Sequence, residues 1–280
     1  MKIPFKVNLE GKVAVVTGGS GVLCSAIGEA LAECGAKVAL VARNLEKTEK
    51  LAKEMTNKGL IVKAYAADVL DRNALEECNE KIKIDLGSCD ILVNGAGGNS
   101  PKATTDDEEF DKTKEGIKTF FDLEPSGVEF VLHLNYLGTL LPTQVFAKDM
   151  VNKEGCCILN ISSMNAFTPL TKIPAYSAAK AGVSNFTQWM ATYFAKAGIR
   201  CNAIAPGFFA TEQNKTLLFN EDGSSTPRTE KILKGTPMDR FGEPEELIGT
   251  ALLLCDSKSS SFITGAVIPI DGGFAAYSGV

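Results

Sequence analysis

The chain has 280 residues, of which 45% are hydrophobic and 22% charged, and its formal net charge is −5. This length suits one large α/β domain, and the acidic balance leaves no basic stripe for nucleic acid or an anionic membrane surface. No apolar run reaches the roughly 20 residues of a transmembrane helix, and the lysine-bearing N-terminus lacks the apolar core of a signal peptide. We therefore expect a cytoplasmic protein that binds neither nucleic acid nor membranes.

The eight cysteines are dispersed, with no C-x-x-C pair, and His133 is the single histidine. Such usage is typical of reduced thiols that pack as small apolar side chains. It predicts no metal site, since zinc sites need clustered Cys and His ligands. The apolar neighbours of His133 indicate a packed position in the core or at an interface.

Apolar segments of strand length alternate with amphipathic segments of helix length. The predicted strands are Val13–Thr17, Lys37–Ala42, Ile61–Ala66, Ile91–Asn94, Cys157–Ser162, Arg200–Ala205 and Ala266–Ile270. The predicted helices are Leu23–Cys34, Leu45–Lys58, Arg72–Asp85, Glu129–Val151, Ala175–Ala197 and Pro244–Cys255. This alternation indicates a Rossmann-type, doubly wound parallel sheet of seven strands, with helices on both faces, in a single domain spanning residues 1–280. Ligands bind such folds at the carboxyl ends of the strands.

Two long polar stretches interrupt the alternation, at about residues 98–128 and 207–243. Loops of this length are uncommon unless they are functional or disordered. Both follow strand ends where a ligand is expected, so we interpret the first as an insertion that can act as a lid and the second as a substrate loop. Surface decoration or contacts between subunits are the alternatives.

The first predicted strand runs into a glycine-rich turn, after which a helix begins. Glycine there lets the backbone approach a pyrophosphate, and the first helical turn supplies amide donors and the positive end of the helix dipole. The predicted nucleotide contacts in this turn are Gly18, Ser20, Gly21, Val22 and Leu23. A tight strand-to-helix connection also needs glycine, so the turn alone does not establish a nucleotide site.

The second strand ends in Ala42-Arg43-Asn44. An acidic side chain at this position would bind the ribose hydroxyls and repel a 2′-phosphate, whereas Arg43 can pair with that phosphate. With Arg43 and Asn44 as contacts, the sequence favours NADP(H) over NAD(H). The alternative is that Arg43 is a solvated charge at a strand end.

The third and fourth strand ends also suit a nucleotide. Asp68, followed by Val69, can accept from the adenine amino group, although it can equally cap the next helix. Small residues after the fourth strand leave room for the cofactor. The predicted contacts there are Asn94, Gly95, Ala96 and Gly97.

Tyr176 is followed four residues later by Lys180, and the segment is predicted to be helical, so both side chains share one face. A free phenol has a pKa near ~10, which a nearby ammonium and an oxidised nicotinamide lower toward the range of a useful acid and base. Ser163, just past the fifth strand, can hold a substrate oxygen. Asn135 is a polar residue in an apolar helix, either satisfied locally or holding a water beside Lys180.

In this order the motifs resemble the short-chain dehydrogenase/reductase family over about residues 9–275. The shared motifs are T-G-G-S-G at Thr17, D-V at Asp68, N-G-A-G at Asn94, N-Y-L-G at Asn135, I-S-S ending at Ser163, Y-S-A-A-K at Tyr176 and I-A-P-G at Ile204. The resemblance implies an oxidoreductase with a catalytic tetrad of Asn135, Ser163, Tyr176 and Lys180, and a homotetramer or homodimer. It also implies cofactor contacts from Pro206, Gly207, Phe209 and Thr211.

The chain departs from the family pattern in two places. Val22 and Cys24 occupy the later glycine positions of the turn, and Gly21 comes one residue early. The stretch between Asn94 and Asn135 is longer than usual. Around these departures, the chain is similar to the D-mannonate oxidoreductase (fructuronate reductase) subgroup. The motifs that carry this resemblance are G-G-x-G-V-L at Gly18, N-G-A-G-G-N-x-P-K-A-T-T at Asn94, S-S-M-N-A-F-T-P-L-T-K-I-P-A-Y-S at Ser162 and A-P-G-F-F-x-T-x-Q-N at Ala205. The resemblance implies NAD(P)H-dependent reduction of D-fructuronate to D-mannonate.

A sugar acid needs polar partners and a cation, and the two polar stretches and the loop after Ser163 provide candidates. The predicted substrate residues are Ser163, Asn165, Lys102, Gln213 and Asn214, with Asn99, Lys172, Lys215 and Arg228 nearby in the sequence. Hydrogen bonds to substrate hydroxyls discriminate strongly against analogues that lack them. Phe208 and Phe209 keep a 3-oxoacyl thioester open as an alternative, beside another keto-sugar acid, a polyol, or a nucleotide-sensing protein without turnover.

Overall fold

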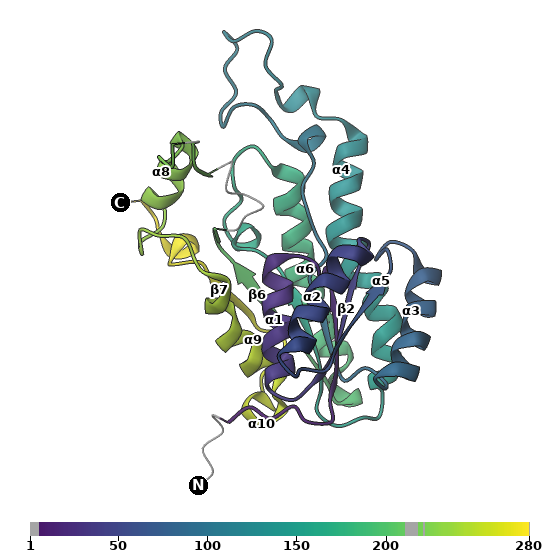
Figure 1. The fold of residues 1–280 in the computed structure, drawn as a ribbon. Helices are drawn as coiled ribbons and strands as arrows, with labels where there is room; N and C mark the ends of the chain where they lie inside the picture. Colours follow the sequence, from purple (N-terminus) through teal and green to yellow (C-terminus); the bar gives the residue numbers. More distant parts are fainter. Residues whose placement is uncertain (1–5, 211–217, 221, 280) are drawn as a thin grey trace.

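The computed structural model describes residues 6–210, 218–220 and 222–279. Its centre is one parallel sheet with the strand order β3-β2-β1-β4-β5-β6-β7 (Figure 1). The strands are β1 (Val13–Thr17), β2 (Lys37–Ala42), β3 (Val62–Ala66), β4 (Ile91–Asn94), β5 (Cys156–Ile161), β6 (Ile199–Pro206) and β7 (Val267–Ile270). The predicted doubly wound sheet of seven strands in one domain is thereby confirmed.

Helices cover both faces of the sheet because successive strand residues point to opposite sides. In β1, Ala14 and Val16 pack into one core with α1, α2 and α9, whereas Val13 and Val15 pack into a second core with α3, α5 and α6. The α-helices are α1 (Val22–Glu33), α2 (Leu45–Asn57), α3 (Arg72–Asp85), α4 (Pro125–Leu132), α5 (Gly138–Phe146), α6 (Pro174–Tyr193), α8 (Pro227–Lys234), α9 (Ile248–Cys255) and α10 (Ser257–Ser260). None of those in the described ranges is both long and apolar enough to cross a bilayer.

The helix predicted over Glu129–Val151 is divided in the structure. A π-helical turn, η3 (His133–Leu137), separates α4 from α5. The Asn135 carboxamide donates to the Val131 carbonyl, competing with the backbone for that acceptor, and Pro142 within α5 has no N–H to donate. His133, at the start of this turn, is exposed, so the expectation that it packs in the core is wrong, and an interface position stays a prediction.

All seven strands end at one edge of the sheet, and the strand order reverses between β1 and β4. Thr17 and Asn94 are register partners at that point, so the turns after these two strands lie side by side. Such a switch point opens a crevice for a ligand in doubly wound sheets. The 98–128 insertion and α8 rise from the same edge (Figure 1).

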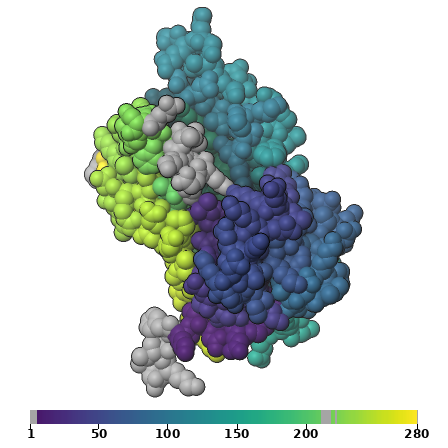
Figure 2. Space-filling model, viewed as in Figure 1, coloured from purple at the N-terminus to yellow at the C-terminus, as the bar shows by residue number. Residues whose placement is uncertain are grey.

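The 98–128 insertion projects beyond the rest of the surface (Figure 2) but is tied to its neighbours. The Thr105 N–H donates to the Lys172 carbonyl at 3.0 Å, and the Lys172 ammonium donates to the Asp106 carbonyl at 2.5 Å. Glu108 pairs with Lys231 of α8 at 2.9 Å. The insertion therefore connects the loop before α6 to the segment that follows β6.

Asp90 organises the opposite edge of the sheet, where the strands begin. Its carboxylate accepts from the Val13 N–H at 2.9 Å and pairs with Lys153 at 2.9 Å and Lys12 at 3.4 Å. The Asp90 side chain is 8% exposed, whereas the two lysines reach solvent. One carboxylate thus joins the starts of β1 and β4 to the loop before β5.

Replacing Asp90 with alanine should lower the free energy of unfolding by about 1–3 kcal/mol, because the buried Val13 N–H loses its acceptor. Asp90→Asn keeps a carbonyl oxygen for that N–H and should lose less. Urea unfolding measures both changes. Since Asp90 lies at the far edge of the sheet from the expected ligand site, a loss of nucleotide affinity without a loss of stability would contradict this account.

Candidate active site

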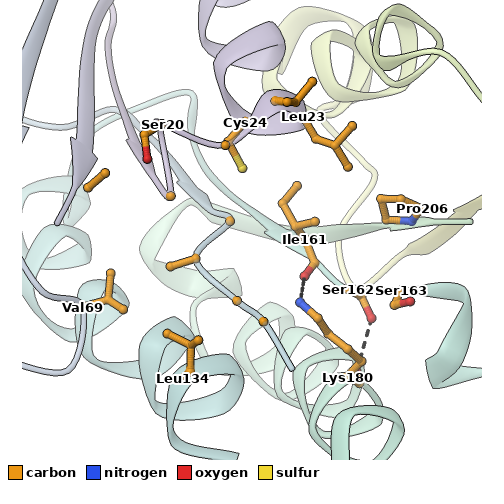
Figure 3. Close-up of a pocket in the computed structure, with 18 of the residues that line it drawn as sticks. Ser20, Leu23, Cys24, Val69, Leu134, Ile161, Ser162, Ser163, Lys180 and Pro206 are labelled. Carbon is orange, nitrogen blue, oxygen red and sulfur yellow. Dashed lines mark hydrogen bonds between the residues drawn. The ribbon is translucent and has the colours of Figure 1, made fainter. Parts of the chain in front are cut away.

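A cavity of about 1040 Å³ opens at the carboxyl ends of the strands (Figure 3). Its walls come from the turns after β1 to β6, from η3 and from α6. The lining residues are Gly18, Ser20, Gly21, Val22, Leu23, Cys24, Ala42, Arg43, Asn44, Ala67, Val69, Gly95, Ala96, Gly97, Gly98, Leu134, Ile161, Ser162, Ser163, Tyr176, Lys180, Pro206, Gly207, Phe208 and Phe209. Arg43 and Lys180 are the cations in this lining, and no carboxylate is among the described residues that form it, so the cavity suits an anionic ligand.

The turn after β1 packs closely on the turn after β4. Gly18 has a φ of +66°, and a Cβ added to it would lie 2.8 Å from the Gly95 carbonyl and the Ala96 nitrogen. A Cβ on Gly95 would overlap the Cys24 sulfur. Both positions therefore require glycine, for backbone conformation at Gly18 and for space at both.

The amino end of α1 fits a phosphate group. No side chain in the described part of the chain caps this helix, and its first turn contains no acidic residue. Gly21, Val22 and Leu23 at this end line the cavity. Unfilled first-turn amides and the helix dipole make such an end an anion site, so this cradle fits the pyrophosphate of a dinucleotide.

The end of β2 forms the far rim of the cavity. Asn44 lines the rim and also caps α2, where its carboxamide oxygen accepts from the Lys47 N–H at 2.9 Å. Arg43 is exposed beside it, and the described residues offer it no ion-pair partner. An anionic group at this rim would meet a guanidinium and no carboxylate.

At the other end of the cavity, Ser163, Tyr176 and Lys180 converge from β5 and α6. The Ser163 hydroxyl accepts from the Asn165 N–H at 3.2 Å, which fixes the start of the short turn that follows β5. The Lys180 ammonium donates to the Ile161 carbonyl at 2.8 Å (Figure 3) and lies 5.6 Å from the centroid of the Tyr176 ring. The helical spacing of four residues accounts for the pairing of Tyr176 with Lys180.

Burial shifts both ionisable groups toward their neutral forms. It lowers the pKa of Lys180 to about 8, with the Cys24 thiol acting in the opposite direction. It raises the pKa of the Tyr176 phenol, and the hydrogen bond with Ser163 opposes that rise. At neutral pH the phenol of the protein alone therefore holds its proton, as a proton donor should, beside a lysine that is mostly charged.

Asn135 completes this end of the site from the π-helical turn. Its oxygen accepts from the Gly98 N–H at 3.3 Å, and its nitrogen donates to the Gly98 carbonyl at 2.7 Å and to the Val131 carbonyl at 2.8 Å. A Cβ on Gly97 would lie 2.6 Å from the Asn135 Oδ1 and 3.3 Å from the Lys180 Nζ. The missing side chain of Gly97 thus leaves space between these two polar groups.

Several predicted contacts lie away from the cavity wall. The Asp68 carboxylate accepts from the Leu70 N–H at 3.0 Å, and the Asn94 side chain is buried among other polar side chains behind the wall. Lys102 is exposed and pairs with Glu124 at 2.8 Å. Asn165 is buried two residues after Ser163, with an Oδ1 that finds no partner in the described chain. The structure therefore does not bring Lys102 to the cavity. Thr211, Gln213 and Asn214 lie outside the described residues.

The cavity also includes residues that the sequence did not single out. Cys24, Leu134, Ile161 and Phe208 are apolar or sulfur-bearing side chains within otherwise ordinary core patterns. Nothing in their periodicity separates a side chain that packs in the core from one that faces a cavity. Gly98 was predicted only as the first residue of the insertion.

The sequence profile of the short chain dehydrogenase family matches residues 12–222. An uncharacterised oxidoreductase of Haemophilus influenzae is 58% identical over 100% of this chain and 99% of its own length. A crystal structure from that organism, provisionally named a D-mannonate oxidoreductase and containing bound NAD, has a TM-score of 0.95 at 58% identity, covering 98% of both chains. A gluconate 5-dehydrogenase of Burkholderia cenocepacia, in complex with NADP and tartrate, has a TM-score of 0.82 at 27% identity, covering 97% of this chain and 98% of its own.

Replacing Gly95 with alanine should weaken nucleotide binding by about tenfold, because the new methyl group displaces the Cys24 side chain or the adjoining turn. The double variant Gly95→Ala with Cys24→Ala should recover part of the affinity, since the Thr17 carbonyl still lies 3.1 Å from the added carbon. Calorimetric titration with NAD(H) and NADP(H) measures the loss.

Gly249→Ala is the matched control, because a Cβ there meets nothing within 4 Å. Equal nucleotide affinity in wild type and Gly95→Ala would show that the two turns do not form the nucleotide cradle.

Proposed function

The chain belongs to the short-chain dehydrogenase family of NAD(P)-dependent oxidoreductases, and from this we propose that it reduces the ketone of a small sugar acid, D-fructuronate, to D-mannonate. The observation that carries the proposal is the convergence of Ser163, Tyr176 and Lys180 at one end of a cavity whose other end suits a dinucleotide. Asn135 is buried directly behind this end, where it is bonded to Gly98. A charged lysine beside a partly buried phenol that is hydrogen-bonded to Ser163 is the arrangement that proton transfer to a carbonyl oxygen needs.

The proposed roles follow from the contacts. The hydroxyls of Ser163 and Tyr176 hold the carbonyl oxygen, and the Tyr176 phenol donates its proton to that oxygen. The reduced nicotinamide supplies the hydride to the carbonyl carbon. Lys180, held by the Ile161 carbonyl, stabilises the phenolate left behind, and Asn135 orients the adjoining backbone at Gly98. These donors meet the developing negative charge in a buried site, where electrostatic stabilisation is strong.

The proposed cofactor contacts run from the glycine turn to the end of β6. The members that line the cavity are Gly18, Ser20, Gly21, Val22, Leu23, Arg43, Asn44, Val69, Gly95, Ala96, Gly97, Tyr176, Lys180, Pro206, Gly207 and Phe209. Asp68 and Asn94 stay proposed cofactor contacts, although they do not line the cavity themselves. Thr211 stays a proposed contact to the nicotinamide amide.

For the coenzyme we propose a preference for NADP(H), carried by Arg43 at the end of β2. The guanidinium is exposed at the rim, where an acidic residue would repel a 2′-phosphate. Bidentate pairing with phosphate is the geometry that guanidinium favours. The Haemophilus structure contains NAD and the Burkholderia structure NADP, so NAD(H) is the competing outcome.

A small, polar, anionic substrate agrees with the names of the relatives and with the polar groups near Ser163. Asn165 lies beside Ser163, and Gln213 and Asn214 remain proposed partners for hydroxyl and carboxylate groups. The 98–128 insertion and α8 are joined through Glu108 and Lys231, which supports a bounded site for a short substrate. Lys102 is no longer proposed, because its ammonium pairs with Glu124 outside the cavity.

We also propose that the enzyme works in the cytoplasm as a homotetramer or homodimer. All eight cysteines are unpaired, as a reducing compartment would keep them. Trp189 and Tyr193 of α6 are exposed and stacked, with ring centroids 4.8 Å apart, and such aromatic surfaces are common at subunit interfaces.

The proposed activity is tested by following the oxidation of NADPH and NADH with D-fructuronate, other keto-acids, a polyol-derived ketone and a 3-oxoacyl thioester. We expect turnover with D-fructuronate and a loss of kcat of about 10²–10⁴-fold in Tyr176→Phe. Nucleotide affinity should change far less, because the other proposed cofactor contacts remain. Tyr277→Phe, at an exposed tyrosine outside the cavity lining, is the matched control.

Turnover of another compound and not of D-fructuronate would reject the substrate and retain the chemistry. If the wild-type protein binds nucleotide but reduces none of the compounds, the proposed activity is wrong and a nucleotide-sensing role gains support. Full activity in Tyr176→Phe would remove Tyr176 from the proton transfer.

Replacing Arg43 with alanine should lower the ratio of kcat/KM for NADPH to that for NADH by about tenfold or more, since one charge-assisted contact to the 2′-phosphate is lost. Arg43→Lys keeps the charge without the planar fork and should fall between the two. Steady-state kinetics with each coenzyme at fixed substrate measure the ratio. A ratio that does not respond to either substitution would refute the assigned role.

A further inference from the structure

Behind the cavity wall, a continuous set of buried polar side chains crosses the ends of β4 and β5. We call it the sheet-end network, formed by Asn94, Asn160, Thr139, Thr143 and Thr187. None of these side chains lines the cavity, and each residue is at most 3% exposed. They lie where the neighbouring strand positions are filled by apolar residues, so their polarity requires an explanation.

The hydrogen bonds of the sheet-end network are short. They link Thr143, Asn94, Asn160 and Thr187 side chain to side chain, and they reach the turn that holds Asn135 through backbone carbonyls of η3 and α5. The Thr139 hydroxyl donates to the Asn135 carbonyl and the Thr143 hydroxyl to the Thr139 carbonyl, each at 2.8 Å. The Asn94 nitrogen donates to the Thr143 hydroxyl and to the Asn160 oxygen, each at 2.9 Å. The Asn160 nitrogen then donates to the Thr187 hydroxyl at 2.8 Å.

The donors and acceptors allow one orientation of the two carboxamides. Thr187 and Thr143 each give their single proton to a backbone carbonyl, of Val183 and Thr139, so each hydroxyl can only accept from an asparagine. Asn160 must therefore present its nitrogen to Thr187 and its oxygen to Asn94. The Asn94 nitrogen supplies the two remaining donors, and its oxygen is left buried without a partner in the described chain.

A network of buried polar side chains is a less favourable way to stabilise a sheet than apolar packing. Each buried polar group loses its hydration, and one that stays unpaired is destabilising. Apolar side chains of similar volume would fill these positions without that loss. What a connected network adds is a restricted geometry, because its hydrogen-bonded members cannot shift independently.

The two ends of the network meet the residues proposed for proton transfer. At one end the Asn135 carbonyl receives the Thr139 hydroxyl. At the other, Thr187 lies on α6, the helix that carries Tyr176 and Lys180. Ser162, directly after β5, donates to the Lys180 carbonyl at 3.2 Å and contacts the Ser184 hydroxyl at 2.7 Å. Together with the Lys180–Ile161 bond, these contacts and the Asn160–Thr187 bond hold α6 to this strand end.

We propose that the sheet-end network is a positioning device that sets the place of α6, and with it Tyr176 and Lys180, relative to Asn135. This inference rests on the proposed function, in which those residues move the proton. Thr187 is the positioning residue that joins α6 to the sheet, and it acts through the helix without touching substrate. Displacements of a fraction of an ångström at the reacting groups are enough to slow such a reaction.

The test compares Thr187→Val with Thr192→Val. Valine keeps the shape of threonine and removes the hydroxyl. Thr192 lies on the same helix and also donates to the carbonyl four residues earlier, at 3.3 Å, but it is exposed and outside the network. Thr187→Ser restores a hydroxyl and is the rescue variant.

We expect Thr187→Val to lower kcat by about tenfold while KM and nucleotide affinity change by less than about twofold, because the groups that move the proton shift while the binding surfaces remain. Thr187→Ser should recover most of kcat, and Thr192→Val should match wild type. Equal kcat in Thr187→Val and Thr192→Val, measured well below the melting temperature, would overturn the proposal and leave the network a purely structural feature.

If Thr187→Val does not fold, Thr143→Val interrupts the same network at α5 and should give the same loss of kcat. Where both fold, the double variant should lose little more than either single variant, since members of one connected network are not additive. Additive losses would show two independent packing defects and overturn the proposal.

A readout without substrate separates this inference from the proposed function. The ultraviolet titration of tyrosinate, taken as the difference from Tyr176→Phe, reports the ionisation of Tyr176. Since burial raises the pKa of that phenol, loosening α6 in Thr187→Val should move the titration to lower pH. A shift without any carbonyl reduction by wild type would support the network and contradict the proposed activity, whereas superimposed titrations would contradict the network.

Discussion

The close approach of the turns after β1 and β4 is the constraint on which the site depends. Gly18 and Gly95 leave room for two backbone segments to touch at the point where the strand order reverses. That contact places the amino end of α1 at the mouth of the cavity. It also sets the position of Gly97, which leaves space beside Lys180, and of Gly98, which is hydrogen-bonded to Asn135. A single bulky residue at this contact would separate the anion-binding amino end of α1 from the proton-transfer groups.

Burial then determines the chemistry that these groups can perform. Desolvation raises the pKa of Tyr176 and lowers the pKa of Lys180, so in both groups it favours the uncharged form. Two hydrogen bonds offset part of this loss of hydration. The Lys180 ammonium donates to the Ile161 carbonyl, and the Tyr176 phenol is hydrogen-bonded to the Ser163 hydroxyl. Behind the cavity wall, Asn94 and Asn160 of the sheet-end network are hydrogen-bonded to each other. They link Thr143 of α5 to Thr187 of α6.

The departures from the family pattern have physical consequences in the structure. Cys24, at a position where the family has glycine, packs against Gly95 and lines the cavity, so a larger side chain is accommodated only because residue 95 has none. The long segment after β4 is anchored at Gly98, at Thr105 and at Glu108, and it bridges to α8. Both departures lie at the ligand edge of the sheet, where a family with one fold varies its substrates.

The sheet, the flanking helices, the glycine turn and the pairing of Tyr176 with Lys180 could be predicted from the amino-acid sequence, because periodicity and local spacing depend on consecutive residues. The sequence did not reveal the π-helical turn, which arises when the Asn135 side chain competes for the Val131 carbonyl. Nor could it separate Lys102, which pairs with Glu124, from a substrate contact, or show that Leu134 faces the cavity. These features depend on which distant segments of the chain meet in the folded protein. The local sequence pattern around a residue does not specify how deeply its side chain is buried or which side chain it will contact.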